Sequence, residues 1–330
     1  MQSMETTPPQ PDARLGQPPL CGPYGRIEPE VFGRVKESGG NALWFHGFDP
    51  PLFEQCEKHG LHACVEVRTF RADFKRYPHL IPVGADGQPI RYGRLVQGVC
   101  LSHEDFLQQI ESELTEGVTA FKPTGVWLDY LTYAGWFETP DPDLQDSCFC
   151  ERCVSEFCET EGVDAASPRT IQEDYGRLWI QHKCRRIAGL ATRYSGIIKN
   201  HLPDCLIGAY MCPYTPTEYD GALSRIFAQD YTLLAEAIDV FTPLFYVNKS
   251  GRRADWGRRF LESAPDFVPP EKLVQPILDF LDFPDSLTEI TGSKVPSWGF
   301  QMFSGAKMFE REDSRKTFGN AVKKISAEWQ

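Results

Sequence analysis

Short hydrophobic runs alternate with helix-period segments along most of the chain. GVWLDYLTY (125–133) is the clearest strand, and 168–200 is the clearest helix because its apolar positions recur at helical spacing. We predict eight strands, at 42–48, 63–70, 94–100, 125–133, 205–212, 240–246, 273–280 and 298–303. We predict helices at 27–38, 50–60, 102–117, 151–161 and 168–200, and near 219–236, 251–264 and 313–328.

Eight strands interleaved with helices over about 300 residues predict an α/β fold, a (β/α)8 TIM barrel. The alternative is an open, doubly wound parallel sheet. That fold usually carries a Gly-rich phosphate turn after its first strand, and HGFDPP (46–51) lacks this pattern. The Pro-rich segment 1–20 is predicted to be a disordered lead-in, and 21–330 to form a single barrel domain.

Strand alternation predicts which side chains enter the barrel. In GVWLDY the valine and leucine suit the helix-covered face, so Asp129 points inward. The same parity directs Glu66, Arg68 and Asp279 inward. Charged groups are costly to bury unless they are paired or used. Three inward carboxylates at strand ends therefore predict a functional site at the C-terminal face of the barrel.

Polar and aromatic side chains at the same strand ends are candidate substrate contacts, because aromatic rings can stack on sugar faces. Trp136 lies in the loop YAGWFETP, and loops at this end of a barrel build the site. An alternative interpretation of Arg68 is a structural ion pair with Glu66. The predicted substrate-binding residues are His46, Arg68, Tyr130, Trp136, Tyr210, Tyr246 and Gln301.

Two segments resemble known glycosidases. WLDYLTY (127–133) resembles the fourth-strand signature of sugar-cleaving (β/α)8 barrels, in which a hydrophobic run ends in an inward Asp followed by an aromatic residue. DSCFCERCVSEF (146–157) resembles the C-x-C-x2-C segment of family 42 β-galactosidases and related glycoside hydrolase barrels. GVCLSHEDF (98–106) resembles their Cys-containing segment at the mouth of the third strand. The resemblance covers about residues 95–160 and implies a (β/α)8-barrel glycoside hydrolase.

The resemblance does not carry over the catalytic residues. Family 42 enzymes have an Asn-Glu pair on the fourth strand, whereas this chain has Leu128-Asp129. An Asp at this strand end is instead the nucleophile in several α-glycosidase families.

Glycoside hydrolysis needs one protonated and one ionised carboxyl group, about 5–5.5 Å apart for retention or about 6.5–9.5 Å for inversion. The fourth and seventh strands of a barrel lie opposite each other, so Asp129 and Asp279 could bracket a sugar ring. We predict Asp129 as the ionised nucleophile or base, with Asp279 as its first-choice partner and Glu66 as its second. Asp282 and Glu218 are further alternatives.

Cys148, Cys150 and Cys153 form a C-x-C-x2-C motif in a loop that enters a helix. Thiolates this close can hold a structural zinc ion with one further ligand. The family resemblance implies Cys100 as that ligand, and Cys158 is the alternative. The competing interpretation is a relic motif with thiols packed under the loop. No cofactor is expected for catalysis itself.

The net charge of the chain argues against some classes of binding partner. The formal net charge of −12 argues against a broad nucleic-acid or anionic-membrane surface. Because no secretory signal and no apolar run of about 18 residues is visible, we expect a cytoplasmic protein with reduced cysteines.

The predicted function is hydrolysis of a short glycan or glycoside, with a small saccharide as the substrate. The alternatives are a non-hydrolytic carbohydrate-binding barrel and a TIM-barrel lyase or isomerase. The predicted strands offer no inward lysine for Schiff-base chemistry. The oligomeric state is left open.

Overall fold

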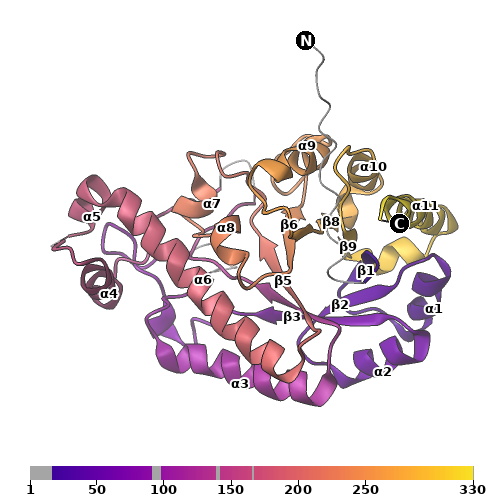
Figure 1. Ribbon diagram of the computed structural model, residues 1–330, viewed down its shortest axis with the longest axis horizontal. Helices are drawn as coiled ribbons and strands as arrows, with labels where there is room; N and C mark the ends of the chain where they lie inside the picture. Colours follow the sequence, from indigo (N-terminus) through magenta and orange to yellow (C-terminus); the bar gives the residue numbers. More distant parts are fainter. Residues whose placement is uncertain (1–16, 91–97, 139–141, 166, 330) are drawn as a thin grey trace, which may run out of the picture.

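The computed structural model describes residues 17–90, 98–138, 142–165 and 167–329, and its core is a closed barrel of parallel strands (Figure 1). The strands follow the spatial order β5-β4-β3-β2-β1-β9-β8-β6, and pairing of β6 with β5 closes the ring. Two short strands that both pair with β6 share one of the eight barrel positions. The strands are β1 (Leu20–Tyr24), β2 (Ala42–His46), β3 (His62–Arg68), β4 (Gly125–Asp129), β5 (Leu206–Met211), β6 (Val240–Phe245), β7 (Leu273–Val274), β8 (Ile277–Asp279) and β9 (Gly299–Phe303).

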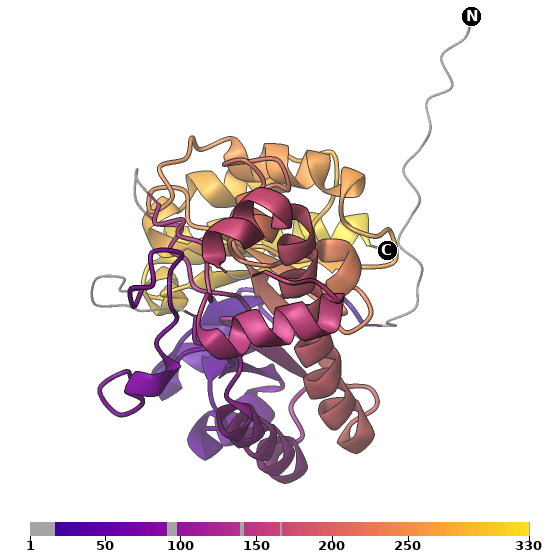
Figure 2. The same cartoon turned by 90° about the vertical axis from the view of Figure 1, so that its left-hand side faces the viewer.

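Helices cover the outside of the barrel, and Figure 2 shows the two halves of the chain on opposite sides of it. In Figure 1 the long helix α6 links the barrel to α4 and α5 at one end of the molecule. The α-helices are α1 (Pro29–Glu37), α2 (Pro50–His59), α3 (Glu104–Phe121), α4 (Glu151–Glu161), α5 (Pro168–Asp174), α6 (Gly176–His201), α7 (Ala222–Arg225), α8 (Tyr231–Leu234), α9 (Trp256–Ser263), α10 (Asp285–Thr291) and α11 (Glu312–Glu328). Short 3-10 helices are η2 (Pro78–Leu80), η3 (Ala264–Asp266), η4 (Phe280–Asp282) and η5 (Gly305–Phe309).

The predicted barrel is confirmed, but the strands that we numbered first and second are its second and third. The first barrel strand is β1, which the sequence pattern missed, so the strand predicted at 42–48 is the second and that at 63–70 is the third. Residues 94–97 of the predicted strand 94–100 lie outside the described residues, and 98–100 form a loop. The two errors offset each other, so β4 keeps the predicted fourth place. The predicted lead-in 1–20 is described only from residue 17, and Leu20 already belongs to β1.

The interior of the barrel is filled by aromatic and amide side chains, and the alternation places them there. The rings of Trp44 and Trp127 meet edge to face with centroids 5.5 Å apart. Trp127 Nε1 donates to Thr242 Oγ1 at 2.8 Å, across from β4 to β6. Buried polar groups require such partners, and here they find them in the barrel interior. This layer of interior side chains supports the C-terminal end of the barrel, where the carboxyl ends of the strands meet.

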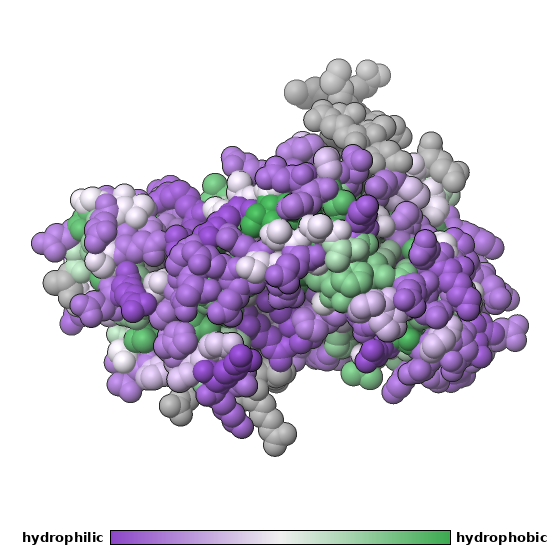
Figure 3. Space-filling model, turned by 90° about the horizontal axis from the view of Figure 1, so that it is seen from below, coloured by the Kyte–Doolittle hydropathy of each residue, from purple (hydrophilic) through white to green (hydrophobic). Residues whose placement is uncertain are grey.

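Within the described ranges, no helix combines the length and apolar character needed to cross a bilayer. The face of the molecule drawn in Figure 3 is mainly hydrophilic, with small hydrophobic patches between the polar side chains.

Candidate active site

A cavity of about 340 Å³ lies at the C-terminal end of the barrel strands, within the size range of small-ligand sites. The ends of β1, β3, β4 and β9 contribute to its wall, together with the loops that follow β3, β4 and β6. Aromatic rings and charged groups alternate around it. The lining residues are Tyr24, Arg68, Arg71, Asp129, Tyr130, Trp136, Phe137, Glu138, Tyr210, Leu244, Tyr246, Lys249, Ile277 and Phe303.

Glu66 is a fully buried carboxylate beside this cavity. Its Oε1 accepts from Arg68 Nε at 2.9 Å, and its Oε2 accepts from the Tyr24 hydroxyl and lies 3.4 Å from His46 Nδ1. The strand register places His46 directly beside Glu66. Burial alone would raise the pKa of Glu66, but the contact with His46, the charge of Arg68 and the Tyr24 hydrogen bond lower it to about 2. Glu66 is therefore the ionised member of the site.

Asp129 lies between Glu66 and the cavity. It ends β4, where the register pairs it with Arg68, and its Oδ1 accepts from the Tyr130 backbone N–H at 2.9 Å. Its carboxyl group is near enough to that of Glu66 for the two charges to interact. Burial, and then the negative charge of Glu66, raise the pKa of Asp129 well above its usual value. Because Glu66 already holds the negative charge, these surroundings favour the protonated acid form of Asp129. The prediction from the sequence was an ionised nucleophile or base.

Asp279 does not line the cavity. It ends β8 and is only 2% exposed. Its Oδ1 accepts from the Leu281 backbone N–H at 2.9 Å, and its Oδ2 lies 2.7 Å from Lys249 Nζ. Asp279 thus caps the following turn and holds Lys249, which does line the cavity. Among the described lining residues, the second carboxylate beside Asp129 is Glu138.

The other predicted residues fall into two groups. Arg68, Tyr130, Trp136, Tyr210 and Tyr246 line the cavity. The remaining two lie outside this lining. His46 is half exposed beside Glu66, and Gln301 is fully buried in the barrel interior, where it hydrogen-bonds with Tyr210 and Gln275. Arg68 also forms the ion pair with Glu66 that the sequence offered as the alternative interpretation of this residue.

Sequence reasoning missed several lining residues, including Tyr24, Arg71, Glu138 and Lys249. Tyr24 ends β1, the strand that was not recognised. The other three lie on loops just beyond strand ends, where alternation no longer predicts direction. The only signal for them was their proximity in sequence to Arg68, Trp136 and Tyr246.

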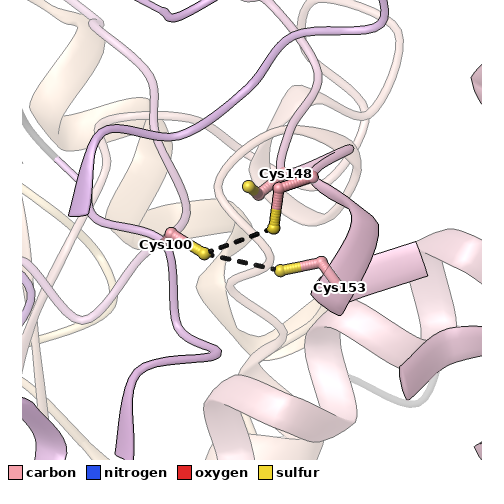
Figure 4. Close-up of side chains that lie close together, drawn as sticks. Cys100, Cys148 and Cys153 are labelled. Atoms are coloured by element: carbon pink, nitrogen blue, oxygen red, sulfur yellow. Dashed lines mark hydrogen bonds between the residues drawn. The ribbon is translucent and has the colours of Figure 1, made fainter. Parts of the chain in front are cut away.

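Four cysteines form a separate cluster, supplied by the loop after β3, the loop after β4 and the first turn of α4; Figure 4 labels Cys100, Cys148 and Cys153. The Sγ atoms of Cys100, Cys148, Cys150 and Cys153 all lie within 4.8 Å of one another. Cys100 Sγ is 3.6 Å from Cys150 Sγ and 3.7 Å from Cys153 Sγ. Zn–S bonds of about 2.3 Å in a tetrahedron would separate the sulfurs by about 3.8 Å. The group could therefore hold a metal ion, and its fourth member is Cys100, as the resemblance implied.

Neighbouring groups complete the surroundings of these sulfurs. The Val83 backbone N–H donates to Cys148 Sγ at 3.4 Å, and Ser102 Oγ lies 3.1 Å from Cys100 Sγ. Such contacts orient thiolate ligands and offset their charge. Cys158 lies outside the group, with its Sγ against the Ala165 carbonyl at 3.9 Å.

No protein-family model matches the chain, and no characterised protein matches it in sequence. Its similar solved structures are glycoside hydrolase (β/α)8 barrels. The PgaB (BpsB) glycoside hydrolase domain from Bordetella bronchiseptica has a TM-score of 0.68 at 11% identity, over 91% of this chain and 98% of that domain. A β-galactosidase from Rahnella sp. R3 has a TM-score of 0.67 at 10% identity, over 98% of this chain.

A family 42 β-galactosidase from G. stearothermophilus, Gan42B, has a TM-score of 0.64 at 11% identity, over 94% of this chain. The match covers 58% of the Rahnella enzyme and 56% of Gan42B, so this chain spans little more than half of each. At these identities the likeness is one of fold, and it agrees with the barrel that the alternating pattern predicted.

Proposed function

We propose that this protein is a glycoside hydrolase that cleaves a short glycan or glycoside at the C-terminal face of its barrel. The observation that carries the proposal is a pair of interacting carboxyl groups at an aromatic-lined cavity, with Asp129 on the cavity wall and Glu66 fully buried beside it. One carboxyl group of the pair is driven to the acid form and the other to the anion, as general-acid chemistry requires. The glycoside hydrolase barrels among the similar structures support this choice.

In this mechanism Asp129 gives its proton to the leaving oxygen as the glycosidic C–O bond breaks. Glu66 is fully buried and does not line the cavity, so it cannot act on the opposite face of a sugar ring from Asp129. We assign the second role to Glu138, which lines the same cavity. Burial raises the pKa of Glu138 and the charge of Lys249 opposes this, which suits a base that accepts a proton from the attacking water. Asp279 acts indirectly, by fixing Lys249.

The competing functions have less support. A Schiff-base lyase needs a lysine that is free to attack the substrate, whereas Lys249 is held 2.7 Å from the Asp279 carboxylate. A non-hydrolytic binding barrel would have no use for an acid held protonated beside an anion, and it would bind saccharides without releasing a product.

Turnover of a panel of aryl glycosides, measured against pH, tests the proposal. We expect sugar release that falls as pH rises through the raised pKa of Asp129, because the acid must be protonated. Glu66→Gln removes the neighbouring charge, so the alkaline limb should move to lower pH. Glu173→Gln, at a surface ion pair on α5, serves as the control and should leave the profile in place. Turnover with no alkaline limb, or a limb that Glu66→Gln does not move, would reject the assignment.

We also propose that the four-cysteine group holds a structural zinc ion. Elemental analysis of the purified protein should return about one zinc per chain, because four clustered thiolates satisfy its tetrahedral preference. Cys153→Ser should lower the zinc content and the thermal midpoint, whereas Cys158→Ser, outside the group, should leave both unchanged. Zinc far below one per chain, or equal losses in the two variants, would contradict the proposal.

A further inference from the structure

Arg71 is a cation on the cavity wall with an aromatic partner. Its Cζ lies 5.2 Å from the centre of the Tyr130 ring, and its Nη1 donates to the Tyr130 hydroxyl at 3.3 Å. Among the described residues, no carboxylate lies within ion-pairing distance of Arg71, in contrast to Arg68 and Lys249. The guanidinium group is thus held in one orientation without its charge being neutralised.

Arg68 presents a second guanidinium group to the cavity three residues earlier in the chain. Its Nε is engaged by Glu66, while 37% of its side chain remains exposed. Glu66 therefore fixes the plane of the group and leaves its outer nitrogens toward the cavity. Two guanidinium groups oriented in this way can offer several N–H donors to a planar anion.

Among the described residues, Arg71 is the lining cation that has no carboxylate within ion-pairing distance. Lys249 is matched by Asp279, Arg68 is matched by Glu66, and the surroundings of Asp129 favour its neutral form. Glu138 is the remaining anion of the lining, and Lys249 lies near enough to act on its charge. An entirely neutral sugar would leave the Arg71 guanidinium group without an anionic partner at ion-pairing distance.

We propose that the saccharide recognised by this site is acidic, and that Arg71, assisted by Arg68, binds a carboxylate group on the sugar unit next to the scissile bond. Tyr130, which supports Arg71, directly follows Asp129, so the anion site adjoins the acid. A uronic acid unit fits this arrangement because its planar carboxylate matches the guanidinium fork. The inference rests on the proposed hydrolase function and specifies its substrate class.

Calorimetric binding tests the inference with D-glucuronate and D-galacturonate, each compared with its neutral parent, D-glucose or D-galactose. We expect each uronate to bind at least about tenfold more tightly than its neutral parent, a gain that charge-assisted hydrogen bonds readily supply. Arg71→Gln should reduce that ratio to about one, and Arg71→Lys, which keeps the charge but loses the fork, should retain part of it. Arg169→Gln on α5, 83% exposed, is the matched control and should keep the full preference.

Three results would overturn the inference: equal binding of uronate and neutral sugar, a preference that survives Arg71→Gln, or tighter binding of glucose 6-sulfate or glucose 6-phosphate than of glucuronate. Turnover is measured separately from binding, so the results distinguish a failure of the hydrolase proposal from a failure of the acidic-sugar proposal. Preferential binding of uronates with no cleavage of uronides would refute hydrolysis and support this inference. Cleavage of neutral glycosides without any uronate preference would support hydrolysis and overturn this inference.

Discussion

Replacing Asp129 with asparagine is expected to lower glycoside turnover by about 100- to 10,000-fold, the range typical for losing a catalytic acid or base. The amide keeps the shape of the side chain and can still hydrogen-bond with Glu66, but it has no proton to give to a leaving oxygen. Folding and saccharide binding should persist. Initial rates on a cleavable glycoside, together with calorimetric binding of the free sugar, measure the two effects separately.

Two further aspartate variants make this experiment decisive. Asp220 is 97% exposed and has a φ of 56°, a conformation that asparagine also tolerates, so Asp220→Asn should leave turnover unchanged. Asp279→Asn should raise KM more than it lowers kcat, because it loosens Lys249 rather than removing a reacting group. A fully active Asp129→Asn protein would refute the acid assignment. Equal losses of kcat in Asp129→Asn and Asp279→Asn would instead restore the pair predicted from the sequence.

The barrel could be predicted because alternating strands and helices leave a strong periodic signal, whereas its first strand could not. LCGPY is only five residues long, contains Gly22 and Pro23, and follows a Pro-rich segment, so it lacks the composition of a strand. Parallel pairing with β9 and β2 nevertheless orders it. Gly22 is required there, because a Cβ would lie 1.7 Å from the Ala42 carbonyl oxygen. Tertiary contact, rather than local preference, decides this strand.

The strand predicted at 94–100 does not enter the barrel between β3 and β4, which pair with each other directly. Its valines and leucine suit a strand, but Gly98 has a φ of 86°, and a Cβ there would lie 2.4 Å from the Ala134 Cα. At Gly98 the backbone therefore packs closely on the loop after β4 in a conformation that a strand does not adopt. In the sequence, the only sign of this contact between distant segments is the glycine itself. Glycine is equally common in turns and at helix ends, where no distant segment approaches it, so a glycine alone does not predict such a contact.

Site residues on strands could be predicted from strand alternation, whereas site residues on loops could not. Parity correctly directed Asp129 and Glu66 inward. It could not show that Glu66 takes the charge, because that depends on contacts with His46, Arg68 and Tyr24, the last of which lies on the missed strand. It also could not show that Lys249 reaches Asp279 from the loop after β6. The cysteine cluster was easier to predict, because three of its members lie within six residues of one another.

The second large effect is expected from Lys183 on α6, whose side chain is completely buried. Its Nζ pairs with the Asp146 carboxylate, donates to the Arg225 carbonyl at 2.7 Å and lies 5.4 Å from the centre of the Tyr133 ring. Asp146 directly precedes the cysteine segment, and Tyr133 lies in the same loop as Trp136. This lysine therefore anchors the loop that contributes to both the cavity wall and the four-cysteine group.

Lys183→Met should destabilise the protein by about 3–5 kcal/mol, because it leaves the largely buried Asp146 carboxylate without its cationic partner. Asp146 would then keep only hydrogen bonds, such as that from Trp179 Nε1 at 3.2 Å. Urea unfolding measures the free energy. Lys58→Met, at an exposed lysine on α2, is the control and should change stability by no more than about 0.5 kcal/mol.

A double variant separates the ion pair from simple packing. Lys183→Met combined with Asp146→Leu removes both charges, so it should lose less stability than the sum of the two single variants. Strict additivity, or a loss in Lys183→Met no larger than in Lys58→Met, would show that the buried pair does not hold this loop. A loss in Lys183→Met accompanied by lower zinc content would tie the pair to the metal site, because Asp146 and Cys148 are only two residues apart.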